Sequence, residues 1–124
     1  DPNNVFTAQF IGTPPMNLLA MENGCRLGYR PEVVRLCREH AAAGYCAAGN
    51  IVTREMLGSE THYKVRLRDG DVMVKTQDKS FCAGEAVYIS VAAGDMYFFG
   101  PDEQRIREGH ARYRECLEAA GGAL

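Results

Sequence analysis

The side chains of this sequence with the clearest potential for binding chemistry are basic and recur at every second position. Four of them alternate with the apolar residues Tyr63, Val65 and Leu67, and a fifth lies in the next apolar segment. Alternate residues of a β-strand point to the same face, so these side chains are expected to form one basic face. The candidate face consists of His62, Lys64, Arg66, Arg68 and Lys75.

Four interpretations of this face remain open. The simplest is a solvated strand face, and the others are a protein-docking face, an oxyanion-binding face and a face for single-stranded nucleic acid. Nucleic-acid binding also needs exposed aromatic rings that stack on bases. Tyr63 is expected on the opposite face and the chain has no tryptophan, so we expect no nucleic-acid partner.

The sequence contains no recognisable catalytic or metal-binding constellation. Cys37 and His40 have metal-ligand spacing and Cys46 follows, but a structural zinc site needs four ligands and a second close pair is missing. Three histidines and five cysteines occur, yet none lies on a nucleophile elbow or a similar frame. We therefore expect no catalytic residue and no metal.

Nucleotide chemistry is also not expected from these residues. A phosphate-binding loop places a Gly-Lys pair, followed by Ser or Thr, in a glycine-rich turn. No Gly-Lys pair occurs, and Lys64, Lys75 and Lys79 all lie outside glycine-rich turns. The prediction is that this chain neither binds nor hydrolyses ATP and carries no cofactor.

The basic face belongs to the clearest hairpin pattern in the chain, over residues 62–76. Asp69-Gly70 is a type I′ turn sequence, because both residues tolerate positive φ, and a two-residue loop then sets the register. On that register Leu67 lies opposite Val72. The remaining predicted pairs are Val65 with Val74, Tyr63 with Thr76, Arg68 with Asp71, and Lys64 with Lys75.

Other segments complete a series of short strands with turns between them. Strands are predicted over 16–22, 26–30, 87–91 and 96–99, with Asn23-Gly24 as one turn and another strand starting near Tyr45 or Asn50. Residues 3–12 favour a short helix, residues 31–36 fit either a helical turn or a strand, and residues 78–85 are a polar connection. Asp102 is a candidate N-cap for a helix over 103–120, with Ile106, His110, Tyr113 and Leu117 on one stripe. Such a series suggests a small barrel or sandwich.

Composition places the chain among ordinary globular domains. It has 124 residues, 46% of them hydrophobic and 24% charged, and a net charge of −2, so no general attraction to nucleic acid or anionic lipid is expected. No apolar run approaches the roughly 20 residues that span a bilayer, and no signal-peptide pattern is present. The five cysteines are odd in number and widely spaced, which favours reduced thiols over a disulfide scaffold.

A proline pair separates the first apolar segment from the rest. Thr13-Pro14-Pro15 follows Gly12, and each proline fixes its own φ and pushes the preceding residue out of the helical region. The segment 9–19 is therefore either an ordinary turn or a junction between domains.

Four motifs, in order, resemble the ATP-binding subunits of carbohydrate and glycerol-3-phosphate ABC importers. Phe-Ile-Gly-Thr-Pro-Pro-Met-Asn at 10–17 resembles the linker that follows the ATPase core in that family. Leu-Gly-Tyr-Arg-Pro-Glu at 27–32 and the glycine-to-threonine run at 49–61 match further motifs, and 84–89 with Phe98-Phe99 resemble the last strands. The residues carried over as family positions are Phe10, Ile11, Gly12, Pro14, Pro15, Met16, Asn17, Gly28, Arg30, Pro31, Glu32, Glu55, Leu57, Gly58 and Glu60.

The resemblance implies a mainly β fold, a small OB-like barrel or sandwich of the TOBE type, with a short N-terminal helical arm and a C-terminal helix. Residues 1–15 would be a linker arm from an absent ATPase domain, 16–100 the β domain, and 101–124 an amphipathic helix and tail. The helix departs from the family pattern, because no turn glycine follows Gly100 before Ile106.

The function implied is a non-catalytic regulatory and dimerisation domain of the ATP-binding subunit. Its expected partners are the ATPase domain of the same parent chain, a second copy of the subunit, a regulatory protein and, indirectly, the membrane subunits. ATP and Mg would bind upstream, and the complex would lie on the cytoplasmic face of the membrane. The alternatives are a stand-alone oxyanion-binding TOBE module and a nucleic-acid-binding OB domain.

Overall fold

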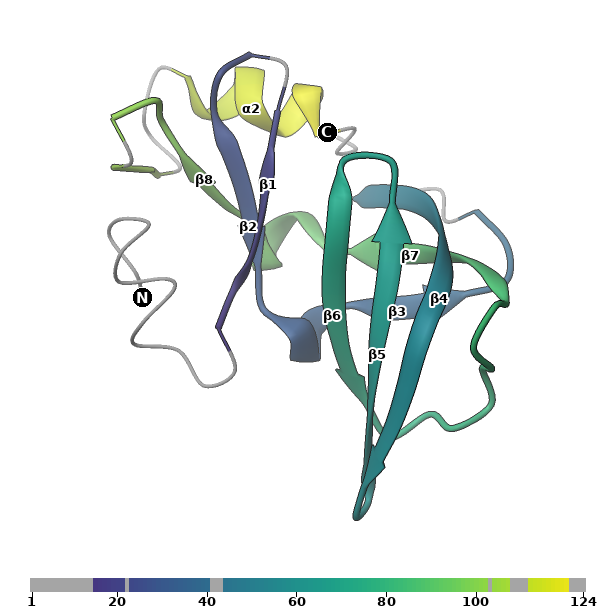
Figure 1. Cartoon of the computed structure of the whole chain (residues 1–124). Coiled ribbons are helices and arrows are strands. Elements are labelled where there is room, and N and C mark those ends of the chain that lie inside the picture. Colours follow the sequence, from purple (N-terminus) through teal and green to yellow (C-terminus); the bar gives the residue numbers. More distant parts are fainter. Residues whose placement is uncertain (1–14, 22, 41–43, 103, 108–111, 121–124) are drawn as a thin grey trace.

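The computed structural model describes residues 15–21, 23–40, 44–102, 104–107 and 112–120. Within these ranges the chain forms two antiparallel sheets and one short α-helix (Figure 1). The smaller sheet has the order β1 (Asn17–Ala20), β2 (Arg26–Tyr29), β8 (Tyr97–Phe99), β9 (Arg105–Ile106). The larger sheet has the order β3 (Arg35–Cys37), β7 (Ala86–Val91), β4 (Tyr45–Leu57), β5 (Glu60–Leu67), β6 (Gly70–Thr76). The predicted mainly β, OB-like fold is confirmed.

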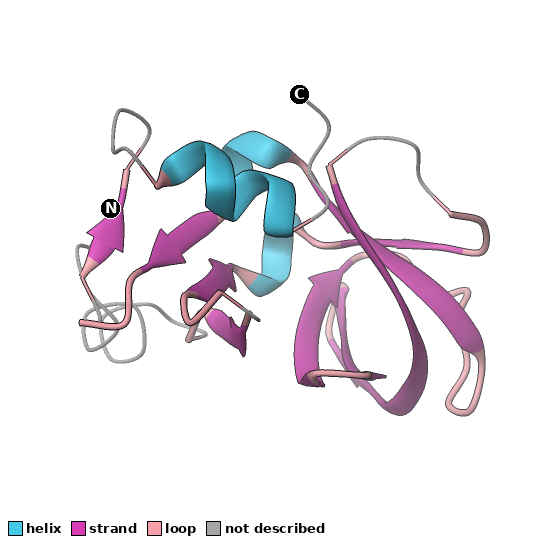
Figure 2. Ribbon diagram, turned by 90° about the horizontal axis from the view of Figure 1, so that it is seen from above, coloured by secondary structure: helices cyan, strands magenta, loops and turns pink. Residues whose placement is uncertain are grey.

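The larger sheet curls around the core (Figure 2), and apolar side chains at alternate positions of its strands face inward. On β5, Tyr63 and Val65 are fully buried, and Ile89 and Val91 on β7 are buried in the same cluster. The predicted inward face of the 62–68 segment and the predicted half-buried strand at 87–91 are therefore correct. Phe81 also joins this core from the connection between β6 and β7, which the sequence pattern had suggested to be only polar.

The β5–β6 hairpin is confirmed, but its predicted register is wrong by two residues. Leu67 pairs with Gly70, and Val65 pairs with Val72 instead of Val74. The loop is therefore Arg68-Asp69, and Gly70 is the first residue of β6. A shift of two keeps every side chain on its predicted face, which is why alternation alone does not detect it.

The shift also replaces the remaining predicted cross-strand pairs. Arg66, not Arg68, lies opposite Asp71, and the partners of Lys64, His62 and Tyr63 are Met73, Lys75 and Val74. The like-charge pair predicted between Lys64 and Lys75 is thus absent from the ladder. Gly70 has φ of +143°, a backbone conformation that L side chains rarely adopt.

Most of the short connections between strands have the conformation that the sequence suggested. Asn23-Gly24 turns the chain between β1 and β2, with Gly24 at φ +84°. Residues left undecided between helix and strand divide into a 3₁₀ turn, η1 (Pro31–Val33), and strand β3. A second 3₁₀ turn, η2 (Ala93–Asp95), precedes β8. Strand β4 starts at Tyr45 and continues past a bulge between Ile51 and Thr53.

The predicted helix over 103–120 is wrong in its first part. Strand β9 occupies part of that range, where Ile106 pairs with Phe98 and is 5% exposed. Asp102 does not cap a helix, because its carboxylate accepts the backbone N–H of Gln104 in a turn. Burial of Ile106 in the sheet outweighs the helical stripe of the local sequence.

The α-helix, α2 (Tyr113–Ala119), begins later and packs on the same core. Cys116 and Leu117 are buried, and the Tyr113 ring meets Phe98 edge to face at 5.7 Å between centroids. Figure 1 shows α2 next to the β1–β2 hairpin, at the end where the chain turns. The predicted helix at 3–12 and His110 lie outside the described residues.

Candidate functional site

Asn17 joins the start of the β domain to the larger sheet. Its side-chain amide donates to the backbone carbonyl of Met73 at 2.8 Å, and its amide oxygen accepts the Met73 N–H at 2.8 Å. The pair of bonds imitates one rung of a β-ladder along the outer edge of β6. Asn17 is 9% exposed, so these bonds satisfy a nearly buried amide. The second residue after the proline pair is therefore fixed to Met73, 56 positions further along the chain.

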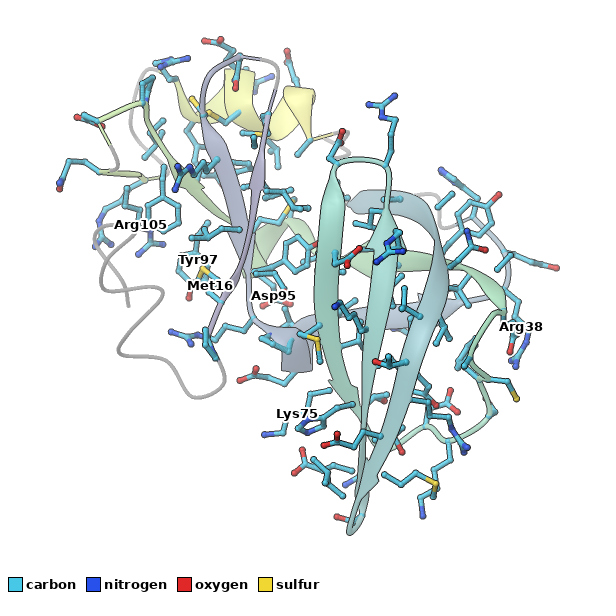
Figure 3. All side chains as sticks on the ribbon, viewed as in Figure 1. Met16, Arg38, Lys75, Asp95, Tyr97 and Arg105 are labelled. Carbon is cyan, nitrogen blue, oxygen red and sulfur yellow. The ribbon has the colours of Figure 1, made fainter. Side chains whose placement is uncertain are left out.

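Met16 and Gly28 form a second contact at the entry to the domain. Met16 is 2% exposed and packs with Phe99, on a cluster separate from the main core. A Cβ at Gly28 would lie 2.6 Å from Met16 Sδ and 3.1 Å from a Phe99 ring carbon. Gly28 therefore provides the space in which Met16 sits. Figure 3 shows Met16 beside Tyr97 on the smaller sheet, with Arg105 next to that ring.

Several of the other predicted residues lie at turns or beside strand ends. Pro31 is buried and begins η1, Arg30 before it is extended, and Glu32 is exposed. Pro15 and Asp69 are exposed. Phe10, Ile11, Gly12 and Pro14 lie outside the described residues. The roles assigned to all these residues stay predictions.

The β4–β5 hairpin extends beyond the rest of the larger sheet (Figure 1). Its tip carries Leu57, which is 46% exposed, and Gly58, whose φ of +65° suits the turn. Glu55 is exposed, and Glu60 lies 3.3 Å from the Lys75 ammonium. The predicted motif residues Glu55, Leu57, Gly58 and Glu60 are thus gathered at one projecting end.

The predicted basic face exists, but carboxylates neutralise much of it. Asp71 accepts two hydrogen bonds from the Arg66 guanidinium, at 3.0 and 3.1 Å, and lies 3.7 Å from the Lys64 ammonium. The hydrogen bonding by Arg66 lowers the pKa of the Asp71 carboxyl from its ordinary value. Arg68 is 3.4 Å from Asp69. The face therefore presents locally paired charges, and Tyr63 is fully buried behind it.

A shallow trough of about 520 Å³ lies on the outer face of the larger sheet, beside these arginines. Arg38 and Tyr88, which the sequence analysis did not single out, line it together with Arg66 and Arg68. No local pattern marks Arg38 or Tyr88, because they come from segments that only the sheet brings next to β5.

Two buried thiols lie in contact: Cys116 on α2 and Cys25 just before β2. The amide of Asn23 accepts the N–H of Cys25 at 3.1 Å and donates to the sulfur of Cys116 at 3.9 Å. Burial, with the contact from Cys25, raises the pKa of the Cys116 thiol to about 11. Among the described residues no group of three His, Cys, Asp or Glu side chains could hold a metal ion. Cys37 is half-buried, while the His40 ring packs edge-on against Tyr88.

No helix in the described part of the chain is long and apolar enough to cross a membrane.

Residues 27–99 of this chain match the family model of the TOBE domain. The sn-glycerol-3-phosphate import ATP-binding protein UgpC of Brucella abortus (strain 2308) is 29% identical over 126 residues, covering 86% of this chain and 36% of that protein. UgpC of Rhodopseudomonas palustris (strain BisB18) is 33% identical over 104 residues, covering 69% of this chain and 28% of that protein. The chain thus spans about a third of the length of these relatives.

Among solved structures, the cytoplasmic molybdate-binding protein ModG with molybdate bound superposes with a TM-score of 0.56. The match covers 62% of each chain at 10% sequence identity, so it shows a shared fold and nothing about ligands.

Proposed function

Because the chain belongs to the TOBE domain family, we propose that it is the non-catalytic C-terminal domain of an ATP-binding subunit that serves an importer of glycerol-3-phosphate or a carbohydrate. The observation that carries the proposal is the coverage. The match covers most of this chain but only about a third of the length of relatives that are named as ATP-binding proteins. This sequence also lacks the Gly-Lys pair of a phosphate-binding loop. The ATP and Mg site would then lie in the part of the relatives that this chain does not cover.

The domain's role in the parent subunit is to keep two copies of the subunit associated. Each proline of the Pro14-Pro15 pair fixes one backbone dihedral, so the junction is stiffer than a flexible linker. A stiff junction lets the position of one domain determine the position of the next. Asn17 and Met16 support this role, since they attach the chain just after the junction to β6 and to Phe99. Two such domains in contact raise the effective concentration of the attached ATPase domains.

The remaining partners follow from the same proposal. The ATPase domain of the parent chain lies upstream, a second copy forms the homodimer, and a regulatory protein binds the assembly. Contact with the membrane subunits runs through the ATPase domain. The subunit would therefore work in the cytoplasm, on the inner face of the cell membrane.

Removing the domain from the parent subunit tests this role. Deletion of residues 16–124 leaves the upstream ATP site in place, so hydrolysis per subunit should fall most in dilute solution and recover at high concentration. The measurement is ATPase activity across a dilution series, with the full-length and truncated subunits side by side. The same concentration dependence in both would refute the dimerisation role and leave partner docking.

The oxyanion-binding alternative has weaker support in this chain. A bound oxyanion needs hydrogen-bond donors that converge on one point. In this chain Arg66 and Lys64 already converge on Asp71, and Lys75 forms an ion pair with Glu60. The molybdate in the ModG structure belongs to that protein, and the likeness is one of fold.

A further inference from the structure

The contact between Cys25 and Cys116 joins two parts of the fold that lie far apart in the sequence. Cys25 is 1% exposed and lies between the β1–β2 turn and β2, whereas Cys116 is fully buried on α2. The two sulfurs lie within hydrogen-bonding reach of each other. A covalent bond between them would attach the helix to the smaller sheet and close a loop around residues 26–115.

The turn residue Asn23 holds both cysteines in place. Its side-chain oxygen accepts the Cys25 N–H at 3.1 Å, and its side-chain nitrogen donates to the Cys116 sulfur at 3.9 Å. Arg112, which precedes α2, donates to the backbone carbonyl of Asn23 at 3.3 Å and interacts electrostatically with both sulfurs. Arg112 thus joins the start of the helix to the turn, so the two sulfurs are kept as neighbours while both are reduced.

The other three cysteines, all within the described residues, are not paired in this way. Cys37 lies on β3 and Cys46 on β4, and β7 separates these strands in the sheet. Two strand spacings amount to about 10 Å, beyond the ~7 Å between Cα atoms that a disulfide can span. Cys82 is exposed on the connection between β6 and β7. The fold therefore favours one pair among the five cysteines.

We propose that Cys25 and Cys116 form a disulfide when the protein meets hydrogen peroxide, and that this redox-sensitive cross-link fixes α2 to the smaller sheet. In total, two thiols and one peroxide molecule give one disulfide and two molecules of water. The site goes beyond the proposed association of subunits, because it lies on an element to which that role assigns nothing.

The oxidation has two steps. In the first, the thiolate of one cysteine attacks a peroxide oxygen and the O–O bond breaks; the leaving hydroxide takes up the proton that the thiol released, which gives a sulfenic acid and one water. In the second, the neighbouring sulfur attacks the sulfenic sulfur, so the S–S bond forms and the S–O bond breaks. The hydroxide that leaves takes the proton of the second thiol and becomes the second water. Two electrons pass from the sulfurs to the peroxide oxygens.

Burial makes this reaction slow, and contact makes it selective. Because burial raises the pKa of the Cys116 thiol to about 11, little of its thiolate is present at neutral pH. Hydrogen peroxide is uncharged and close to water in size, so a small local opening admits it, whereas a larger reagent needs α2 to leave the core. Once one sulfur is a sulfenic acid, the contact gives the second sulfur a high effective concentration.

The test treats the folded 124-residue chain with hydrogen peroxide, then unfolds it with an alkylating agent present to block the remaining thiols. Trypsin digestion and mass spectrometry identify the disulfides. Cleavage after Arg26 and Arg114 places Cys25 and Cys116 in the peptides 1–26 and 115–124. The expected product is these two peptides joined, with the loss of two hydrogen atoms, and dithiothreitol should separate them. The comparison is the same treatment in urea, where the unfolded chain should join its cysteines in mixed pairs.

The oxidised chain should also resist unfolding. A disulfide that closes a long loop restricts the unfolded chain, so the urea midpoint should rise by about 1 M. Cys116→Ser should show no rise after peroxide treatment. The matched control, Cys82→Ser, removes an exposed cysteine and should show the same rise as the wild type. The peptide map of the wild type decides the pairing even where Cys116→Ser fails to fold.

Three results would overturn the proposal. If both buried thiols stay open to alkylation, or become sulfinic acids without a link, the contact does not lead to a bond. If the folded chain gives the same mixture of pairs as the chain in urea, the fold selects no pair. If the disulfide forms and the urea midpoint does not rise, the cross-link does not hold α2. The bond forms within one chain, so a failure here is separate from a failure in the dilution series.

Discussion

Replacing Asn17 by alanine tests whether the hydrogen bonds between Asn17 and β6 stabilise the attachment of the start of the β domain to the larger sheet. The side chain makes two hydrogen bonds of 2.8 Å, both to the backbone of Met73. Truncation removes both bonds and leaves a part-buried N–H and C=O of Met73 without these partners. The edge of β6 also loses the group that covers it.

The expected loss follows from the energies of these bonds. A hydrogen bond of this kind contributes about 0.5–1.5 kcal/mol net, and leaving a buried partner unsatisfied adds to the cost. Two bonds therefore give a loss of roughly 2–3 kcal/mol in the free energy of unfolding for Asn17→Ala. The matched control is Asn50→Ala, since Asn50 is exposed on β4 and its side chain makes no hydrogen bond in the described structure. It should change stability by about 0.5 kcal/mol or less.

Urea unfolding followed by circular dichroism measures both variants. The midpoint of Asn17→Ala should fall with little change in the slope, because the surface exposed on unfolding stays nearly the same. Equal midpoints for Asn17→Ala and Asn50→Ala would refute the reasoning. Such a result would mean that water replaces the amide at the β6 edge without cost, and that the entry of the chain is not coupled to the sheet in this way.

Three further perturbations probe the turn, the paired charges and the buried thiols. Gly70→Val should lower the free energy of unfolding by roughly 1–3 kcal/mol, since a β-branched residue is costly at φ of +143°. Urea midpoints measure this loss. The control is Gly94→Ala, because a Cβ at Gly94 would meet no other atom within 4 Å. Hydrogen bonding by Arg66 lowers the pKa of the Asp71 carboxyl in the folded protein. The contribution of Asp71 to stability is therefore complete above about pH 4 and is lost as pH falls through the folded pKa. On acidification, the urea midpoint of Asp71→Asn should fall less than that of the wild type. Ellman's reagent at mildly alkaline pH should modify exposed Cys82 quickly and Cys116 only after unfolding, because burial raises the pKa of the Cys116 thiol to about 11.

Each of these tests has an outcome that contradicts it. An unchanged midpoint for Gly70→Val would mean that the backbone at this position does not need glycine. Parallel acid dependence in the wild type and Asp71→Asn would show that the carboxylate gains nothing from its guanidinium partner. Rapid modification of Cys116 in the folded protein, measured by mass spectrometry, would show that α2 opens readily.

Alternation of apolar and polar residues was enough to predict the β5–β6 hairpin and strand β7, with the side chains that face inward. Tyr63, Val65 and Leu67 are buried as predicted, because side-chain direction in a strand depends only on local backbone geometry. The turn at Asn23-Gly24 was also predictable from its residues, because glycine readily adopts the positive φ that Gly24 has here. The family motifs likewise allowed the TOBE resemblance to be stated from the sequence, and the match over residues 27–99 confirms it.

Contacts between distant segments decided the rest. The register of β5 and β6 moved by two residues, a shift that preserves the faces and so leaves no trace in the pattern. Ile106 entered a strand because pairing with Phe98 buries it, although the local sequence favours a helix. Asn17 meets Met73 across 56 positions, and the trough combines Arg38 with Arg66 only because the sheet order places β7 and β4 between β3 and β5. Local pattern specifies which way a side chain points, whereas its partner depends on the packing energy of the whole fold.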